Sequence, residues 1–175
     1  MTISLPRCST TEVTDLAARD AVAAIAAFLT NIGIGLRAEP LAVEQFLPGI
    51  AIRKGELIYD PEKLLYPGDL LHEAGHIAVT DPALRPALSA PSDDPGEEMA
   101  AIAWSWAAAM DIGIAPEILF HEGGYRGGGA ALIENFSNGR DVGVPWLAAW
   151  DMTIERHRAL KEGSIPFPQM RRWLR

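Results

Sequence analysis

The stretch Leu70–Val79, LLHEAGHIAV, constrains this chain more than any other part of the sequence. It places His72 and His76 four positions apart, with Glu73 directly after the first histidine. In an α-helix, residues four apart lie on the same face, one turn from each other, so both imidazoles can point at one metal ion. The stretch therefore predicts a metal-binding helix.

Zinc is the metal that this pattern favours. Two neutral histidines and one carboxylate leave a fourth position for a water molecule, whose pKa falls to about 7 on zinc. Glu73 would lie beside the ligands and could take a proton from that water without ligating. The alternative is a helix with two incidental histidines, but the chain has only four histidines, which makes a chance match rare.

A third protein ligand is expected from an acidic residue further along the chain. The segment SDDPGEEMAAIAWSWAAAM predicts a second helix, with Asp94 as its N-cap and Pro95 as its first residue. Glu97 would then complete a capping box, which leaves Glu98 free to turn toward the metal. We predict Glu98 as the ligand, with Glu97, Asp81 and Asp94 as alternatives.

Two further elements are expected before the metal helix. A first helix should begin at a capping box of Ser9 and Glu12 and end at NIGIG, residues 31–35. The segment GIAIRKGELIYD, residues 49–60, predicts two short strands around Lys54-Gly55.

The ends of the metal helix can also be predicted, and with them the fold class. Asp69 is expected to cap this helix, and Thr80-Asp81-Pro82 to end it, before a loop rich in proline and aspartate. These elements predict a mostly helical α+β fold with a small sheet or hairpin before the metal helix. The chain, residues 1–175, is expected to form a single domain.

The order of these elements resembles the gluzincin branch of zinc metallopeptidases. The closest likeness is to the compact bacterial ImmA/IrrE type, carried by LLHEAGH and EEMAAIAW and covering about residues 50–110. The resemblance implies a minimal zincin-like core. It also implies His72 and His76 as ligands, Glu73 as general base and Glu98 as third ligand.

The chain departs from two related patterns. Metzincins continue the helix motif to a glycine and a third histidine, where this chain has Val79 and Pro82. Thermolysin-like members carry an aspartate four residues after the ligand glutamate, where this chain has Ile102. The partner that would orient a ligand histidine is therefore unassigned by the sequence.

A glycine-rich segment, LFHEGGYRGGGAALIENF, supplies the remaining candidate site residues. His121 or Tyr125 could donate a hydrogen bond to the oxyanion of an acyl-transfer reaction, and Arg126 could hold a substrate carboxylate. The glycines suit a tight turn between two helices, a flap over the site, or a turn that exposes amides to an anion. The tryptophans Trp104, Trp106, Trp146 and Trp150 are interpreted as packing residues.

Composition and charge indicate which kinds of partner and which cellular location to expect. The net charge of −8 argues against a nucleic-acid partner. The single cysteine, Cys8, excludes an intrachain disulfide and a cysteine-based zinc cluster. The N-terminus lacks the layout of a signal peptide, and the longest apolar run, AVAAIAAFL, is too short to span a bilayer. We expect a cytoplasmic protein, and its oligomeric state stays open.

Three functions fit these features. The first is a zinc-dependent metallopeptidase that hydrolyses a peptide bond with Glu73 as general base, its substrate lying along the strand pair. The second is a metal-dependent hydrolase of a non-peptide amide or other small molecule. The third is a metal-binding regulatory or structural protein without turnover.

Overall fold

The computed structural model describes residues 10–42 and 47–175, with side chains from Ala18 onward. Cys8 and Ser9 lie outside the described residues, as does the side chain of Glu12, so the expected capping box of Ser9 and Glu12 stays a prediction. The elements in chain order are α1 (Thr10–Ile32), β1 (Leu36–Ala38), β2 (Ile50–Arg53), β3 (Glu56–Tyr59), α2 (Gly68–Val79), the 3₁₀ turn Arg85–Ala87, α3 (Pro95–Ile112), α4 (Pro116–Leu119), the 3₁₀ turn Tyr125–Gly127, α5 (Gly129–Ser137), α6 (Val144–Ala149) and α7 (Arg156–Glu162).

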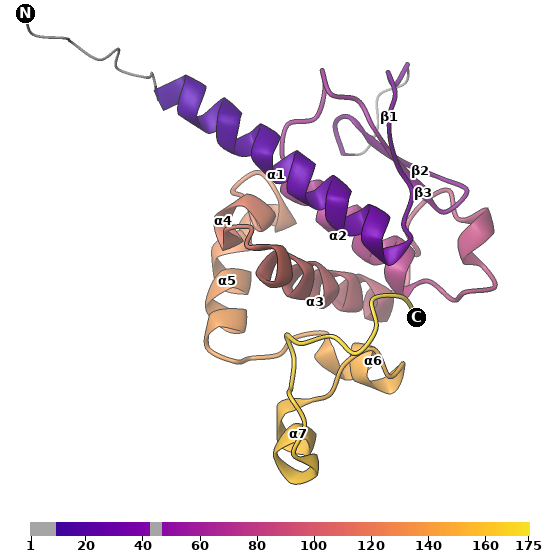
Figure 1. The fold of residues 1–175 in the computed structure, drawn as a ribbon, viewed down its shortest axis with the longest axis vertical. Coiled ribbons are helices and arrows are strands. Elements are labelled where there is room, and N and C mark those ends of the chain that lie inside the picture. Colours follow the sequence, from indigo (N-terminus) through magenta and orange to yellow (C-terminus); the bar gives the residue numbers. More distant parts are fainter. Residues whose placement is uncertain (1–9, 43–46) are drawn as a thin grey trace, which may run out of the picture.

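The sheet has three strands in the order β1-β3-β2 (Figure 1). The predicted hairpin of β2 and β3 is confirmed, and its two turn residues, Lys54 and Gly55, have φ values of 52° and 73°. Positive φ values at both positions are those of a type I′ turn, one of the two common turns of two-residue hairpins. The third strand, β1, pairs parallel to β3 and was not predicted, because three residues are too few to show an alternating pattern.

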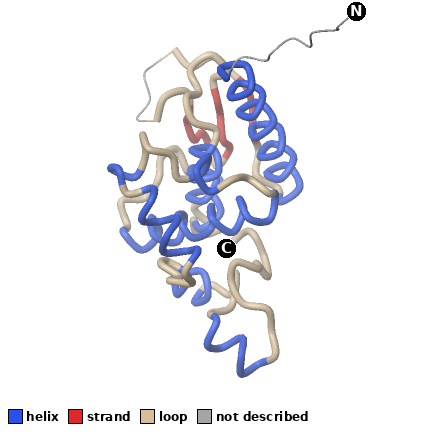
Figure 2. Tube along the Cα trace, turned by 90° about the vertical axis from the view of Figure 1, so that its left-hand side faces the viewer, coloured by secondary structure: helices blue, strands red, loops and turns tan. Residues whose placement is uncertain are grey.

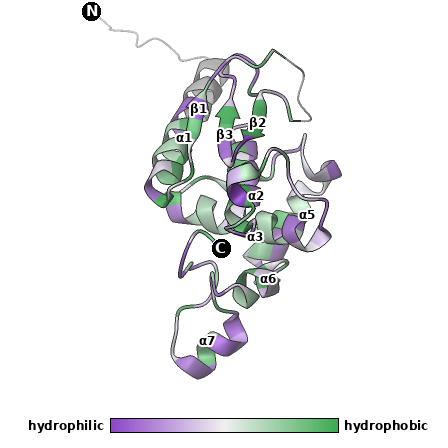
Figure 3. Ribbon diagram, turned by 90° about the vertical axis from the view of Figure 1, so that its right-hand side faces the viewer, coloured by the Kyte–Doolittle hydropathy of each residue, from purple (hydrophilic) through white to green (hydrophobic). Residues whose placement is uncertain are grey.

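Helix α2 lies at the centre of the fold, in contact with the sheet, α1, α3 and α4. Figure 2 shows the small sheet covered by helices, and Figure 3 shows apolar residues along β2 and β3. Eleven of the twelve residues of α2 are buried, as is most of α3 from Ala100 to Ala109. The mostly helical α+β fold is therefore as predicted.

Helices α2 and α3 approach each other closely in the core. A Cβ atom on Gly75 would lie 2.8 Å from the backbone oxygen of Ala101, closer than real Cβ atoms come to such an atom. Glycine at this position therefore allows the two helices to pack backbone against backbone.

The first turns of α2 and α3 differ from the capping that the sequence predicts. Asp69 does not cap α2: Pro67 precedes the helix, and Asp69 is its second residue. Asp94 caps α3 as predicted, its carboxylate accepting a hydrogen bond from the Gly96 N–H at 2.7 Å. The capping box is wrong, however, because the Asp94 N–H donates to the Ser92 hydroxyl instead of to Glu97.

The ends of α1 and α2 are confirmed. Helix α1 ends at Ile32, and Gly33 follows with a φ of 86°. Helix α2 ends at Val79, after which Thr80 is extended. The following loop contains a short 3₁₀ turn whose Arg85 donates hydrogen bonds to carbonyl groups at the end of α2.

Helices α6 and α7 lie at the end of the molecule opposite the sheet (Figures 1 and 3). The chain returns from them to the α2–α3 pair, where the Trp104 indole donates to the Trp173 carbonyl at 2.8 Å. Trp104 and Trp106 are buried in the core, as expected, whereas Trp146 is 49% exposed. Within the described residues, none of the helices has the length and apolar character needed to cross a membrane.

Candidate metal centre

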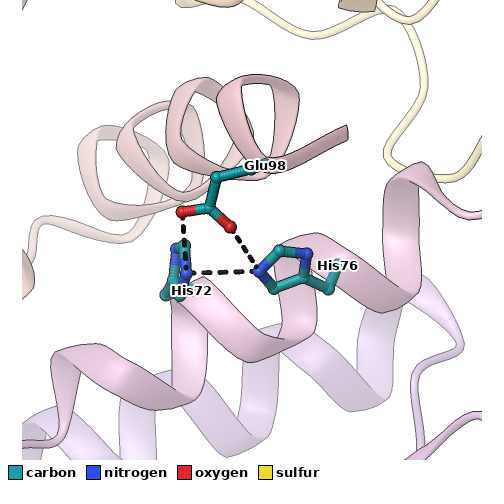
Figure 4. A group of neighbouring side chains, drawn as sticks. All are labelled: His72, His76 and Glu98. Carbon is teal, nitrogen blue, oxygen red and sulfur yellow. Dashed lines mark hydrogen bonds and ion pairs between the residues drawn. The ribbon is translucent and has the colours of Figure 1, made fainter. Parts of the chain in front are cut away.

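Three side chains from α2 and α3 meet at one point (Figure 4). The Nε2 atoms of His72 and His76 are 3.2 Å apart. The two carboxylate oxygens of Glu98 lie 3.6 Å from the His72 Nε2 and 3.1 Å from the His76 Nε2. The predicted helix motif and the predicted glutamate therefore form one cluster.

The packing of α2 on α3 brings Glu98 to the histidines. Ala101, which meets Gly75 at this close contact, is three residues after Glu98 and so lies on the same face of α3. The neighbouring Glu97 points elsewhere and forms an ion pair with Arg175 at 3.5 Å. Adjacent helical residues point about 100° apart, so only one of the two can face α2.

Asp94 and Asp81, the other two alternatives for the third ligand, also make their contacts elsewhere. Asp94 caps α3, and the Asp81 carboxylate accepts a hydrogen bond from the Ala83 N–H at 2.8 Å. Among the described residues, the cluster that could hold a metal has three members, His72, His76 and Glu98.

The geometry of the cluster fits a tetrahedral ion. Zinc–ligand bonds of about 2.0–2.1 Å put two ligand atoms about 3.3 Å apart, close to the separations observed here. His76 is buried and the His72 side chain is only 12% exposed, whereas Glu98 is 44% exposed. The cluster is thus accessible mainly from the side of Glu98.

The charge states also suit metal binding. Burial, with help from the neighbouring His76, lowers the pKa of His72 to about 4, so this imidazole is neutral near pH 7, as a ligand must be. The hydrogen bond from His76 lowers the pKa of Glu98, which keeps that carboxylate ionised.

Glu73 is buried beside the cluster but is not part of it. Burial raises the pKa of Glu73 to about 7, and the negative charges of Asp69 and Glu98 act in the same direction against the opposing effect of His76. A carboxylate with a pKa near neutrality can both accept and release a proton, which is what a general base in this position needs.

Tyr125 is brought next to the cluster by the glycine-rich segment. Its ring meets the His72 ring edge-on, with centroids 5.4 Å apart. Its hydroxyl is buried and has no hydrogen-bond partner among the described residues. Burial raises the pKa of Tyr125, and the charges of Asp69, Glu98 and Glu73 raise it further, so the hydroxyl stays protonated and can donate.

His121 and Arg126 have different surroundings. The His121 Nε2 lies 2.9 Å from the Asp69 carboxylate, and Tyr66 stacks on the imidazole with centroids 3.6 Å apart. Arg126 is exposed and makes no ion pair with the described residues, so the structure does not bring it into the cluster.

Asp69 and Tyr66 are the neighbours of the site that the sequence reasoning missed. Asp69 precedes His72 by three positions and Glu73 by four, so its place on the metal-bearing face could have been read from helical spacing. The sequence pattern instead predicts Asp69 as the cap at the start of the metal helix.

The orientation of His72 is set by packing. Its Nδ1 atom is buried without a hydrogen-bond partner among the described residues. Ile102, which stands where thermolysin-like enzymes have an aspartate, is a buried apolar residue. Contacts with His76 and Tyr125 therefore take the place of a carboxylate that would orient the ligand.

Searches of protein-family models, curated protein sequences and solved structures find no match to this chain. The structure by itself shows a possible metal site of two histidines and a glutamate, in the spacing of an HExxH motif.

Proposed function

We propose that the protein is a zinc-dependent hydrolase of the gluzincin type that cleaves peptide bonds. The observation that carries this proposal is the division of roles between two glutamates. Glu98 completes a ligand triangle with His72 and His76, while Glu73 is buried just outside that triangle with a raised pKa. A purely structural site would need a fourth protein ligand, and the described cluster has three.

The residues around the cluster divide the chemistry between them. A zinc ion bound here would supply a water molecule of lowered pKa and a positive charge to polarise a carbonyl group. Glu73 is placed to take a proton from the attacking water and to pass it to the leaving amine. Tyr125 offers a buried, protonated hydroxyl to the developing oxyanion.

A peptide substrate would lie along β2. In the described part of the chain, β2 pairs with β3 on one side and has no strand on the other. It also contacts α2, the helix that carries both histidines. A free strand edge offers backbone groups to an extended peptide. The exposed Arg126 would hold a carboxylate of the substrate.

The proposal is tested with quenched fluorescent peptides on zinc-loaded protein, zinc-stripped protein and a Glu73→Gln variant. Hydrolysis is expected only with zinc, and Glu73→Gln should lower it by about 10²–10⁴-fold while zinc stays bound. Glu117→Gln, at an exposed site, is the matched control and should cleave at the wild-type rate. Loss of zinc from Glu73→Gln would make Glu73 a ligand and contradict this mechanism.

A second candidate is supported by the burial of His72 beneath Tyr125. Such cover favours a small substrate, and the same residues would then hydrolyse a non-peptide amide. A panel of N-acyl amino acids, assayed beside the peptides, distinguishes the two. Turnover of the small amides without cleavage of any peptide would replace the peptidase by this function.

A further inference from the structure

A buried hydrogen bond joins the first turn of α2 to the glycine-rich segment. The carboxylate of Asp69 and the Nε2 of His121 are 2.9 Å apart, and both side chains are buried. Tyr66 covers the imidazole, with the two rings nearly parallel at an angle of 9°. His121 is therefore held by a hydrogen bond on one side and by an aromatic ring on another.

The segment from His121 to Gly129 turns tightly around this histidine. A Cβ atom on Gly124 would lie 3.0 Å from the His121 Cε1, and one on Gly129 would overlap the Phe120 carbonyl. Tyr125 has a φ of 52°, a conformation that side-chain-bearing residues adopt only when their surroundings enforce it. His121 and Tyr125 are thus joined by a tight turn, which the Gly124 N–H closes by donating to the His121 carbonyl at 3.2 Å.

Helix α2 carries Asp69 and two of the three metal ligands, His72 and His76. Asp69 precedes His72 by one turn of α2, so the distance from the Asp69 anchor to the ligand is set by helix geometry. The Tyr125 ring meets Phe120 on one side and His72 on another. Its hydroxyl is enclosed there, with no hydrogen-bond partner in the described part of the chain.

We propose that Asp69 is a positioning residue, which acts through His121 to aim the Tyr125 hydroxyl at the oxygen of a molecule bound at the His72–His76–Glu98 site. A hydrogen bond between two buried polar side chains does little more than offset the cost of removing them from water, so stability alone gives little reason for this contact. This inference rests on the proposed function, because it requires a ligand at the metal site.

The test measures the affinity of the zinc-loaded protein for acetohydroxamate, a small zinc-binding acid. Tyr125→Phe should raise its dissociation constant about tenfold through the loss of one hydrogen bond. Asp69→Ala should have a similar effect, and the double variant should bind no more weakly than either single variant. The control is Asp60→Ala, which removes another buried aspartate, one bonded to the Leu41 and Glu62 N–H groups. It should leave the constant unchanged.

Additive effects of Asp69→Ala and Tyr125→Phe, or wild-type affinity in Asp69→Ala, would overturn the inference and leave the proposed function standing. Failure of the wild-type protein to bind zinc would overturn both. If Asp69→Ala does not fold, Tyr66→Ala replaces it, because Tyr66 is 38% exposed and touches the same histidine. The same non-additivity with Tyr125→Phe is then expected, and additive effects would again overturn the inference.

Discussion

Replacing Gly75 by alanine tests whether the contact between α2 and α3 builds the metal site. The added Cβ would stand 2.8 Å from the Ala101 oxygen, about 0.6 Å inside the 3.4 Å at which ordinary contact begins. The place of the Cβ is fixed by the α2 backbone and its partner is a backbone oxygen of α3, so the helices themselves must separate. Glu98 would then move away from His72 and His76.

The magnitude follows from two opposing effects. Overpacking in a core costs about 1–3 kcal/mol, and alanine in place of glycine within a helix returns about 1 kcal/mol. The free energy of unfolding should therefore fall by up to about 2 kcal/mol. For a chain of this size, each kcal/mol lowers the melting temperature by about 2–4 °C. Zinc affinity should fall by at least about tenfold, the scale seen when the support of a ligand is disturbed.

Thermal melts of the zinc-free protein and zinc titrations against a chromophoric chelator measure both quantities. Gly68→Ala is the matched control, since it makes the same substitution in the same helix but its Cβ meets the backbone of Ile118 in α4. It should lower stability while zinc affinity is retained. A higher melting temperature for Gly75→Ala, together with wild-type zinc affinity, would refute the reasoning.

Three other expectations concern the site directly. Purified protein should carry about one equivalent of zinc by elemental analysis, and His72→Ala should abolish zinc binding. Full metal content in His72→Ala would show that the motif is incidental. Glu98→Ala should weaken zinc binding strongly. Glu97→Ala should keep zinc and lower the free energy of unfolding by about 0.2–1 kcal/mol through the lost ion pair with Arg175. The reverse pattern in zinc titrations and thermal melts would make Glu97 the ligand. Because the pKa of Glu73 is raised from 4.5 to about 7, the zinc-free native state holds a proton that the unfolded state releases, and stability should fall as pH rises from about 4.5 to 7. Glu73→Gln should flatten that part of the urea-denaturation profile, and an unchanged slope would speak against the raised pKa.

The sequence by itself determined the features that depend on neighbouring residues. Helical spacing places His72 and His76 on one face, and the left-handed pair Lys54-Gly55 closes the hairpin. Asp94 caps α3 through the Gly96 N–H two residues later. Each of these rests on contacts within a few positions, which local conformational preferences and hydrophobic periodicity specify.

Tertiary structure decided what depends on distant residues. Glu98 was predicted as the ligand from a capping box that does not form; the packing of α2 on α3 places it at the histidines, while Glu97 pairs with Arg175, which lies 78 positions further along the chain. Asp69 finds its partner in His121, 52 positions away, and is not a cap. Such pairs form only where packed helices bring remote segments together, and the distances between packed backbones are not written in local sequence spacing.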